Sequence, residues 1–347
     1  MVKKLLEEIQ IENELKKDYL IALKPNLINA TKTQKGATTD PKIIEGIIEY
    51  LKDKGFNNII IMEGSWVGEN TERAFQHCGY KELSKKHKVP LYNLQQDKYI
   101  TKAYKDLEIE IAATALKADY IINIPVLKGH SQTKITCALK NLKGCISNRE
   151  KRKFHRQGLH KPIAYLNKLL KQDLIIVDGI YGDLDFEEGG SPVKMDRIMA
   201  AKDPVLIDSY IAELMGYSQA DIEYIKIAEQ IGVGNKDWKQ AKIKEINQSQ
   251  SININYKTDK LKKYAAKIEA KDVCSACYGS LIQALKKIDK KGDLEDIPEP
   301  IKIGQGYQGQ KIKGIGIGNC CQNAEKYIEG CPPDTENIID FIINRNS

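Results

Sequence analysis

The sequence contains no long hydrophobic run, and this absence limits where the protein works. No segment approaches the roughly 20 consecutive apolar residues that a membrane-spanning helix needs. The opening residues, MVKKLLEEIQIENELKK, interrupt their apolar positions with charge every two or three residues. A secretory signal has an unbroken apolar core of about seven residues or more. We therefore expect a cytoplasmic protein with no membrane partner.

The sequence also lacks a block of charge of one sign. Its 54 lysines and arginines and 47 aspartates and glutamates, which give a formal charge of +7, are scattered along the chain. A nucleic-acid-binding surface concentrates its basic residues and, for single strands, interleaves them with aromatic ones. The densest basic stretch, NREKRKFHRQG at residues 148–158, lacks such interleaving. We therefore expect no nucleic-acid partner.

Two nucleotide-binding signatures are missing as well. The stretch GVGNKD at residues 232–237 lacks the second half of the glycine-rich dinucleotide fingerprint, and nothing matches a phosphate-cradling P-loop. There is also no internal repeat and no low-complexity tract. We therefore assign no nicotinamide site.

The sequence does contain a repeated alternation of apolar strands and helical stretches. Isoleucine-rich runs typical of buried strands occur at residues 19–26, 57–64, 118–126 and 172–180. Helices are predicted at residues 41–55, around 133–142, and from 204 to about 216. Asp40 and Pro41 suit the cap and the first position of the first of these helices. The alternation predicts an α/β fold with a mostly parallel sheet flanked by helices, which binds ligands at the carboxyl ends of its strands.

Chain length and composition predict two domains. A chain of 347 residues exceeds the roughly 250–300 residues at which a single core stops growing. The alternation fades between about residues 238 and 271, where the polar stretch NQSQSININYKTDK occurs. We place an α/β domain with a substrate pocket at residues 1–245 and a smaller α/β cysteine domain at 246–347. The smaller domain is predicted to contain a helix after Cys274, two strands in PIKIGQG and KIKGIGIG, and a last helix within DTENIIDFII.

Four of the eight cysteines form a pattern in the second domain. Because cytosolic thiols stay reduced, such a cluster indicates metal binding or catalysis rather than disulfides. Cys274 and Cys277 form a CxxC at a predicted helix start, where the positive end of the helix favours thiolates. Three glycines lead into Cys320 and let backbone N–H groups approach an anionic guest, and two prolines stiffen the chain after Cys331. The segment can therefore enclose a metal cluster.

This pattern resembles the proximal-cluster motif of nickel-iron hydrogenase small subunits, in which a CxxC, a Gly-x-Cys and a Gly-Cys-Pro-Pro hold a 4Fe-4S cluster. The matching letters are CSAC, GNC and EGCPP, within residues 274–333. The resemblance implies four ligands, Cys274, Cys277, Cys320 and Cys331, with Cys321 as the substitute for Cys320. A structural zinc ion is the alternative, although zinc modules usually pair two close knuckles. We interpret the remaining cysteines as ordinary buried residues: Cys78, Cys137 and Cys145.

The larger part of the chain resembles the domain of unknown function 362 family, whose members are often associated with iron-sulfur proteins. The motifs that carry the resemblance are LKPNL (23–27), TTDP (38–41), LKGHSQTKITCALKNLKG (127–144), VDGI (177–180) and AAKDPVLID (200–208). They cover most of residues 20–230. The family name states that its chemistry is not settled, so the resemblance implies an iron-sulfur association but no reaction.

Polar residues follow the predicted strands where the strands end. We predict catalytic roles for His130, Lys128 and Lys140, because basic groups there suit an anionic substrate and His130 can move protons near neutral pH. We predict substrate-binding roles for six further residues: Lys24, Asn26, Glu63, Asn141, His155 and Asp178. The ordinary alternatives are a solvated loop lysine, a helix cap and a histidine with satisfied hydrogen bonds.

The hypothesis that uses both domains is a redox enzyme. In it, a 4Fe-4S cluster exchanges single electrons with a small anionic substrate, a carboxylate or a phosphate, and a protein such as ferredoxin is the redox partner. A carrier of electrons or of clusters, without catalysis, is the first alternative. A cluster with an open iron that acts as a Lewis acid needs only three cysteines, whereas four are present. A racemase- or lyase-type enzyme with a structural cluster rests on a loose similarity of the histidine and lysine spacing to lactate racemase and its relatives.

Overall fold

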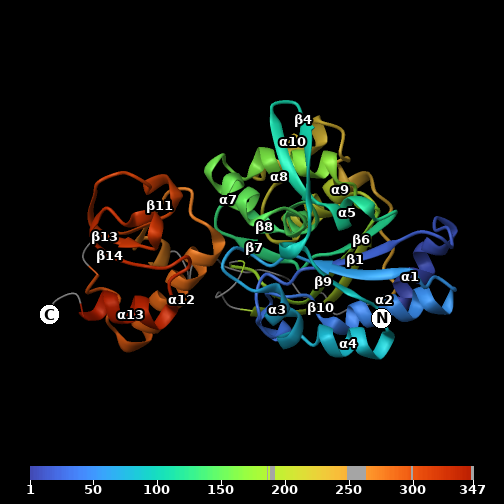
Figure 1. Cartoon of the computed structure of the whole chain (residues 1–347), viewed down its shortest axis with the longest axis horizontal. Coiled ribbons are helices and arrows are strands. Elements are labelled where there is room, and N and C mark those ends of the chain that lie inside the picture. Colours follow the sequence, from blue (N-terminus) through green and yellow to red (C-terminus); the bar gives the residue numbers. More distant parts are fainter. Residues whose placement is uncertain (186, 188–191, 248–262, 298–299, 345–347) are drawn as a thin grey trace.

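The structure is a computed structural model that describes residues 1–185, 187, 192–247, 263–297 and 300–344. Two bodies lie side by side, a larger one formed by residues before 248 and a smaller one formed by residues after 262 (Figure 1). Each body has its own sheet and its own hydrophobic core. Apart from Asn247, the polar stretch NQSQSININYKTDK at the predicted boundary lies outside the described residues.

The larger body is built on a six-stranded sheet. Across the sheet the strands are β10 (Pro192–Ala201), β9 (Leu174–Asp183), β6 (Tyr120–Ile124), β1 (Ile21–Pro25), β2 (Ile59–Glu63) and β3 (Leu91–Asn93). All neighbouring strands pair in parallel except β10, which pairs antiparallel with β9. The predicted α/β class with a mostly parallel sheet is confirmed, and the carboxyl ends of five strands meet at one edge.

Helices cover both faces of this sheet because its central strands are buried on both sides. Successive side chains of a strand point to opposite faces, so Ile21 and Leu23 join one core and Ala22 joins the other. The first core is covered by α1 (Val2–Ile9), α2 (Pro41–Asp53), α3 (Thr71–His77) and α4 (Tyr80–His87). The second is covered by α5 (Ala113–Lys117), α6 (Ala138–Asn141), α7 (Asn148–Arg156), α8 (His160–Leu169), α9 (Pro204–Leu214) and α10 (Glu223–Gln230).

Two helices begin at the residues that the sequence predicts. The Asp40 side chain accepts a hydrogen bond from the N–H of Lys42, and Pro41 is the first residue of α2. Asp203 caps α9 in the same way, with Pro204 at the first position. Such caps satisfy backbone donors that have no partner within the helix.

The predicted helix around residues 133–142 is wrong over its first half. Residues Lys134–Thr136 form strand β8, which pairs antiparallel with β7 (Lys128–His130), and the helix begins only at Ala138, the first residue of α6. The reason is local. The His130 ring accepts hydrogen bonds from the N–H groups of Gln132 and Thr133, and this side-chain bonding competes with helix formation.

The smaller body contains a four-stranded parallel sheet. In order its strands are β11 (Ile268–Ala270), β12 (Ile301–Ile303), β13 (Ile312–Ile317) and β14 (Ala324–Ile328). Two helices, α12 (Ser275–Lys291) and α13 (Thr335–Ile343), pack their apolar faces on it. The helix after Cys274, the two predicted strands and the last predicted helix are all confirmed.

The remaining elements are short. A hairpin is formed by β4 (Tyr99–Tyr104) and β5 (Leu107–Ala112). The 3-10 turns are η1 (Ile11–Asn13), η2 (Thr33–Lys35), η3 (Leu94–Gln96), η4 (Leu142–Cys145), η5 (Gln219–Asp221), η6 (Trp238–Gln240), η7 (Gln305–Tyr307) and η8 (Asn319–Cys321).

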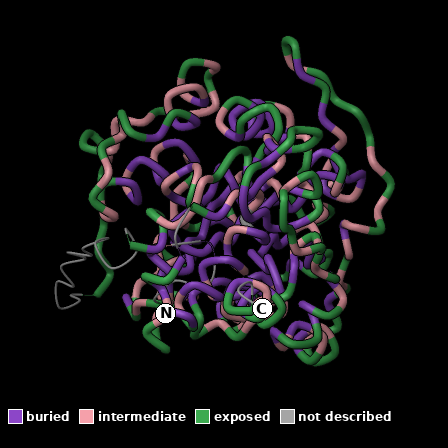
Figure 2. The backbone as a smooth tube through the Cα atoms, turned by 90° about the vertical axis from the view of Figure 1, so that its left-hand side faces the viewer, coloured by how far each residue is buried: buried purple, intermediate pink, exposed green. Residues whose placement is uncertain are grey.

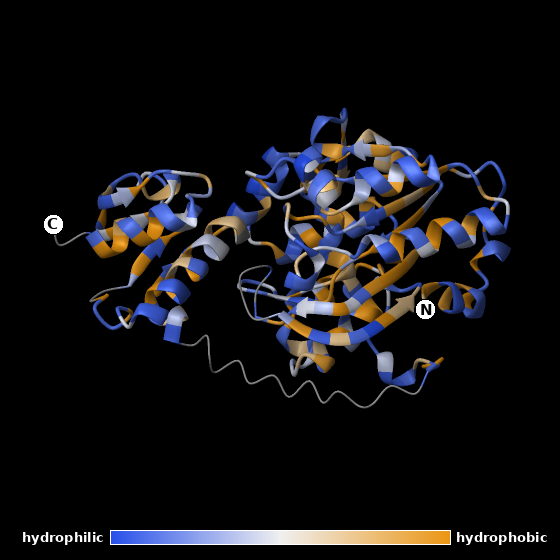
Figure 3. Cartoon of the chain, turned by 90° about the horizontal axis from the view of Figure 1, so that it is seen from below, coloured by the Kyte–Doolittle hydropathy of each residue, from blue (hydrophilic) through white to orange (hydrophobic). Residues whose placement is uncertain are grey.

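Buried segments run through the interior and exposed ones follow the outside (Figure 2), and the apolar residues concentrate on the strands (Figure 3). In the described parts of the chain, every helix is too short or too polar to cross a membrane.

Candidate functional site

A cavity of about 190 Å³, here called the interdomain cavity, lies where the two bodies meet. One wall belongs to the larger body, at the carboxyl ends of its parallel strands: Asn26 follows β1, Glu63 ends β2, and Lys140 and Asn141 end α6. The other wall belongs to the smaller body and contains four cysteines: Cys274, Cys277, Cys320 and Cys331. Polar residues at strand ends and the cysteine pattern therefore face the same space.

The four cysteines reach the cavity from three segments of the smaller body. Cys274 is the residue before α12, Cys277 lies in the first turn of that helix, Cys320 lies in η8, and Cys331 follows β14. Gly318 lies in the cavity wall with a φ of +84°, and a Cβ there would lie 3.7 Å from the Cys277 sulfur. A glycine at this position keeps the space beside that sulfur open.

Cys321 points away from the cavity. Its thiol donates a hydrogen bond to the carbonyl oxygen of Lys302, and its side chain packs with Tyr307 and Ile312 in a small core. The neighbouring Cys320 lines the cavity instead. The structure thus places Cys320, and not Cys321, with the other three cysteines.

The spacing of the four sulfurs differs from that of a compact zinc site. With a zinc–sulfur bond of about 2.3 Å, tetrahedral ligands lie only about 3.8 Å from one another. Among the residues that the structure describes, no three of these sulfurs lie within 4.8 Å of one another.

The environment of Cys274 favours its thiolate. A hydrogen bond from Cys277 and the nearby ammonium of Lys143 bring the pKa of Cys274 to about 7, although burial raises it. The same hydrogen bond and burial raise the pKa of Cys277. The thiolate is the form that binds metals. Of this pair, Cys274 is therefore the cysteine that ionises more readily and is better suited to act as a ligand.

The cysteine wall docks on a loop of the larger body. Gly68, in the loop after β2, has a φ of +97°, and a Cβ there would lie 2.7 Å from Cδ of Pro332 and 2.8 Å from the carbonyl oxygen of Cys331. Helix α7 contacts η7 nearby. Only a residue without a side chain lets the Cys331 segment approach this closely.

Beneath the cavity lies a buried ion pair between adjacent strands. Nζ of Lys24 on β1 lies 2.5 Å from Oε2 of Glu63 on β2, and both side chains are almost wholly inaccessible. A Cβ on Gly144 would lie 2.6 Å from that Nζ. Glu63 lines the cavity, whereas Lys24 lies behind it and supports the wall.

Lys128 also lies behind the wall. Its ammonium donates to Oδ1 of Asn26 and to the carbonyl oxygen of Ala37, each at 2.8 Å. Asn26 in turn donates to Oδ1 of Asn141 at 2.6 Å. Lys128 therefore orients the two asparagines that line the cavity and is not itself among the lining residues.

His130 lies outside the lining of the cavity, and its tautomer is fixed. Nδ1 accepts hydrogen bonds from the N–H groups of Gln132 and Thr133, so the proton of the neutral ring is on Nε2, which lies 3.5 Å from Oε2 of Glu187. Burial and the charge of Lys140 hold the pKa of His130 well below its usual value. The geometry describes a neutral donor to a buried carboxylate.

Glu187 connects His130 with Lys140. Its Oε1 lies 2.5 Å from Nζ of Lys140, and its side chain lies in the cavity wall. Burial would raise the pKa of Glu187, but Lys140 and His130 together hold it well below its usual value. Glu187 was not predicted as a site residue.

Helix α7 supplies further cavity residues. His155, a predicted substrate-binding residue, lines the cavity together with Lys151 and Arg152. Its Nε2 lies 3.3 Å from Nζ of Lys143, and its Nδ1 lies 3.1 Å from Oε1 of Gln132. Within this basic stretch, Phe154 and His155 are buried.

Three basic residues of the cavity were missed from the sequence: Lys143, Lys151 and Arg152. Burial lowers the pKa of Lys151 to about 8, and its ammonium donates to the carbonyl oxygens of Gly64 and Ser65 at 3.0 and 2.7 Å. For α7 the available signal was helical spacing: Lys151 stands four residues before His155, so the two lie on one face of the helix.

Asp178 lies away from the cavity lining. Its carboxylate accepts hydrogen bonds from the N–H groups of Asp40 and Ile180, at 2.8 and 3.0 Å. Burial raises its pKa to about 6. These contacts describe a residue of β9 that holds the start of α2 against its own strand.

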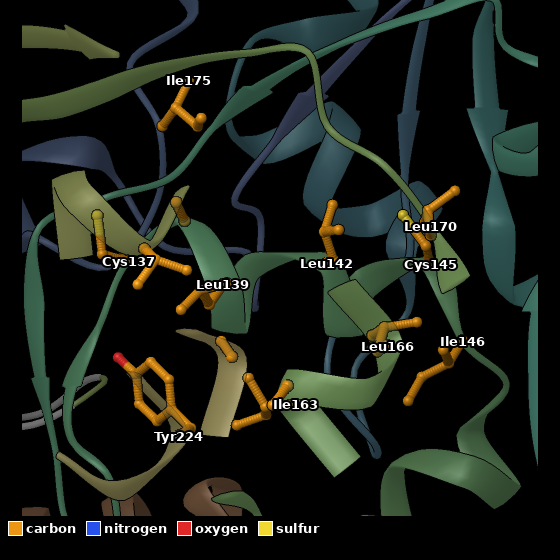
Figure 4. Packing of buried hydrophobic residues seen from close by; sticks show 14 of the residues in the cluster. Cys137, Leu139, Leu142, Cys145, Ile146, Ile163, Leu166, Leu170, Ile175 and Tyr224 are labelled. Atoms are coloured by element: carbon orange, nitrogen blue, oxygen red, sulfur yellow. The ribbon is translucent and has the colours of Figure 1, made fainter. Parts of the chain in front are cut away.

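The other cysteines and one surface cluster lie outside the cavity. Cys137 and Cys145 pack among apolar side chains of the larger core (Figure 4), and Cys78 is buried as well. Glu45, Glu49 and His87 place three ligand atoms close together on partly exposed helices. Their charges are already met by lysines: Lys86 pairs with Glu45 and Lys3 pairs with Glu49.

Fold and site define an α/β protein whose strand-end cavity is shared with a small cysteine-bearing domain. The chain belongs to the family described as domain of unknown function (DUF362), whose model matches residues 21–213. This match spans the strands and loops that supply the basic wall of the cavity. The four cysteines lie after it.

A curated relative is the thylakoid-associated protein sll1697 of Synechocystis sp. The two are 24% identical over 232 residues, which is 64% of this chain and 70% of the relative. The name of this relative states a location and no reaction.

Two solved structures are similar to part of this chain. The lactate racemase apoprotein from Thermoanaerobacterium thermosaccharolyticum has a TM-score of 0.35 and 13% identity, over 61% of this chain and 48% of that one. A crystal structure of a Thermotoga maritima protein has a TM-score of 0.40 and 12% identity, over 66% and 58% of the two chains. The chain thus spans about half to three fifths of these proteins. At such scores the similarity carries no argument about function.

Proposed function

We propose that the protein binds a 4Fe-4S cluster through Cys274, Cys277, Cys320 and Cys331 and is a redox enzyme for a small anionic substrate. The observation that carries this proposal is that the four cysteines and the basic residues at the strand ends line one cavity. This composition supports the proposal, because a cluster held by the cysteines would lie beside groups that can bind an anion.

The residues present fit an iron-sulfur cluster. Four thiols, the ligand type that such clusters use, reach one space from three segments, and a glycine keeps that space open beside Cys277. The spacing of the sulfurs is wider than a single zinc ion needs. When bound, a 4Fe-4S cluster supplies one-electron transfer at a potential set by charge and hydrogen bonding around it.

The larger body supplies the binding groups for the substrate. Lys143, Lys151 and Arg152 give the wall positive charge, while the charges of Lys140 and Glu187 balance each other. Asn26 and Asn141 add amide groups whose orientation is fixed by hydrogen bonds. An anion placed here would be held by charge and oriented by neutral donors.

A carrier without catalysis is the competing function. A carrier needs an exposed cluster and a partner surface, but it has no use for an enclosed set of cationic and amide groups. The two functions differ in what reoxidises the reduced protein. A carrier transfers its electron to a protein, and the enzyme transfers it to a small anion.

The test starts from protein purified without oxygen and reduced with dithionite. The EPR spectrum should contain the signal of a reduced cluster, and it should be altered or lost in Cys331→Ser. The matched control is Cys78→Ala, which removes a buried thiol of the larger body and should leave the spectrum unchanged.

The reduced protein is then mixed with a panel of oxidised carboxylates and phosphate esters. The proposal expects at least one of these anions to restore the absorbance of the oxidised protein, and Lys140→Gln to slow that step. Reoxidation by ferredoxin alone, with every anion inert, would identify a carrier. A cluster-free protein would refute both functions.

A further inference from the structure

A second hollow, here called the edge groove, lies at the free edge of the large sheet. Its volume is about 430 Å³, within the range of about 300–1,000 Å³ that is usual for small-molecule pockets. One side is formed by the consecutive residues Arg197–Ala201 of β10, the strand that ends the six-stranded sheet. Ile198 packs with one core and Met199 with the other, so the groove runs along the edge itself. The other sides are α1, α9, Trp238 and the segment 241–247.

The lining of the edge groove is rich in apolar and aromatic side chains. The rings of Tyr210 and Trp238 meet edge to face with their centroids 5.0 Å apart, and both residues line the groove. Ile243 and Ile246 line it as well, although 55% and 37% of their surface is exposed. Exposed large apolar side chains that gather at one hollow mark a binding surface. A ligand with an apolar chain would cover them.

Three basic side chains reach the edge groove from three different elements. Lys4 belongs to α1, Arg197 to β10 and Lys242 to the segment 241–247. Among the described residues, none of the three has a carboxylate oxygen within 4.0 Å. The guanidinium of Arg197 stands on a strand, and its planar fork matches the two oxygens of a carboxylate.

The other charges of the lining are mostly balanced. Lys244 pairs with Glu8, and Asp196 lies 2.9 Å from the ammonium of Lys194. Within the described parts of the chain, Glu245 is the carboxylate of the lining that has no such partner. Three unpaired cations thus face one unpaired carboxylate, and the groove favours an anion.

An extended peptide that adds a strand to β10 is the other class of guest that a sheet edge can take. The start of β10 opposes this. The register with β9 shifts between Lys194 and Arg197, and Asp196 has a φ of +51°. Bulges and charged side chains are the features by which edge strands resist further pairing. The observations therefore favour a small molecule.

We propose that the edge groove binds a long-chain carboxylate of the fatty-acid type. Its chain lies along the apolar lining beside Tyr210 and Ile243, and its carboxylate pairs with Arg197, with Lys4 and Lys242 adding positive charge. The inference goes beyond the proposed function and is independent of it, because the edge groove and the interdomain cavity share no lining residue. Binding here requires neither a cluster nor an electron.

The experiment is isothermal titration calorimetry of the full chain with hexanoate, octanoate and decanoate, each kept below the concentration at which it forms micelles. We expect one molecule per chain and about fourfold tighter binding for each CH₂ group added. Decanol, which has the same chain without the charge, should bind at least ten times more weakly than decanoate. Arg197→Gln should weaken decanoate to the level of decanol and leave decanol unchanged.

A second variant tests the apolar part of the groove. Ile243→Asn should weaken decanoate at least fivefold, whereas Ile100→Asn should have no effect. Ile100 is the matched control, since it is 42% exposed on β4 and lies outside the groove. Neither substitution alters a core.

The series on the wild-type chain decides the matter even if a variant folds poorly. Affinity that does not rise with chain length would overturn the proposal, as would an equal effect of Arg197→Gln on decanoate and decanol. Binding to vesicles of anionic phospholipid without binding of the free acids would also overturn it, because the groove would then be a membrane-contacting surface.

Discussion

Nζ of Lys24 and Oε2 of Glu63 lie 2.5 Å apart in the interior, on adjacent parallel strands, directly below the cavity floor. Removing one partner of a buried ion pair leaves the other charge without compensation, which costs about 3–5 kcal/mol. We therefore expect Glu63→Gln to lower the free energy of unfolding by about that amount. Urea denaturation followed by tryptophan fluorescence measures it, because both tryptophans, Trp66 and Trp238, lie in the larger body.

The double variant Lys24→Met with Glu63→Leu is the matched control. It removes both charges and replaces them with apolar side chains of similar size, so most of the lost stability should return. If Glu63→Gln unfolds at the same urea concentration as the wild type, the ion pair does not stabilise the wall of the cavity.

The environment of His130 predicts an acid-sensitive fold. Because burial and Lys140 lower the pKa of His130 in the folded state, the folded chain binds fewer protons than the unfolded one below about pH 6.5. Stability is then present above that pH and is lost as the pH falls. His155 acts in the same direction.

His130→Asn isolates this contribution. The amide oxygen can accept the same two backbone hydrogen bonds as Nδ1, but it does not titrate. We expect the stability advantage of the wild type over this variant to shrink as the pH falls from 7 to 5, by up to about 1.4 kcal/mol per pH unit. Parallel urea curves at each pH provide the measurement, and equal slopes for the two proteins would show that His130 is not held neutral.

Gly68 predicts how the two bodies stay together at the cavity. Gly68→Ala adds a methyl group that would meet Pro332 and the backbone of Cys331, at a φ that non-glycine residues rarely adopt. Gly216→Ala is the matched control, since Gly216 has a φ of +79° with no atom within 4 Å of the added carbon. Both variants place a side chain at a positive φ, and only the first brings it against the Cys331 segment.

The measurement for this pair is the rate at which a chelator removes iron from the purified protein. We expect Gly68→Ala to lose iron at least ten times faster than the wild type, with Gly216→Ala close to the wild type. Equal rates for the two variants would mean that backbone strain alone explains the effect and that docking at Gly68 does not protect the site.

The architecture could be predicted well from the sequence because its signals are local. Isoleucine-rich runs specify strands such as β2, and Asp40 with Pro41 specifies where α2 begins. Residues at the ends of parallel strands, Asn26 and Glu63 among them, reach the cavity because the carboxyl ends of the parallel strands lie at one edge of the sheet. These inferences need no knowledge of distant contacts.

The parts that could not be predicted depend on contacts between distant residues. The ring of His130 lies beside Glu187, and nothing near His130 in the sequence indicates that partner. Its neutral state comes from burial and the charge of Lys140, which Glu187 opposes. Lys143 reaches the cavity because η4 and α7 pack together, which brings it beside His155. The cavity shared by the two bodies likewise arises from the way they dock, which the local sequence of neither body indicates.

The measurement that tests the central claim most directly is the iron, sulfide and zinc content of the full chain after purification without oxygen. The account predicts about four irons and four sulfides per chain and no stoichiometric zinc, with both iron and sulfide reduced in Cys331→Ser. One zinc per chain without sulfide would contradict it. The four cysteines would then hold a structural zinc ion, and the chemistry of the protein would have to be sought among Lys143, His155 and the residues around them alone.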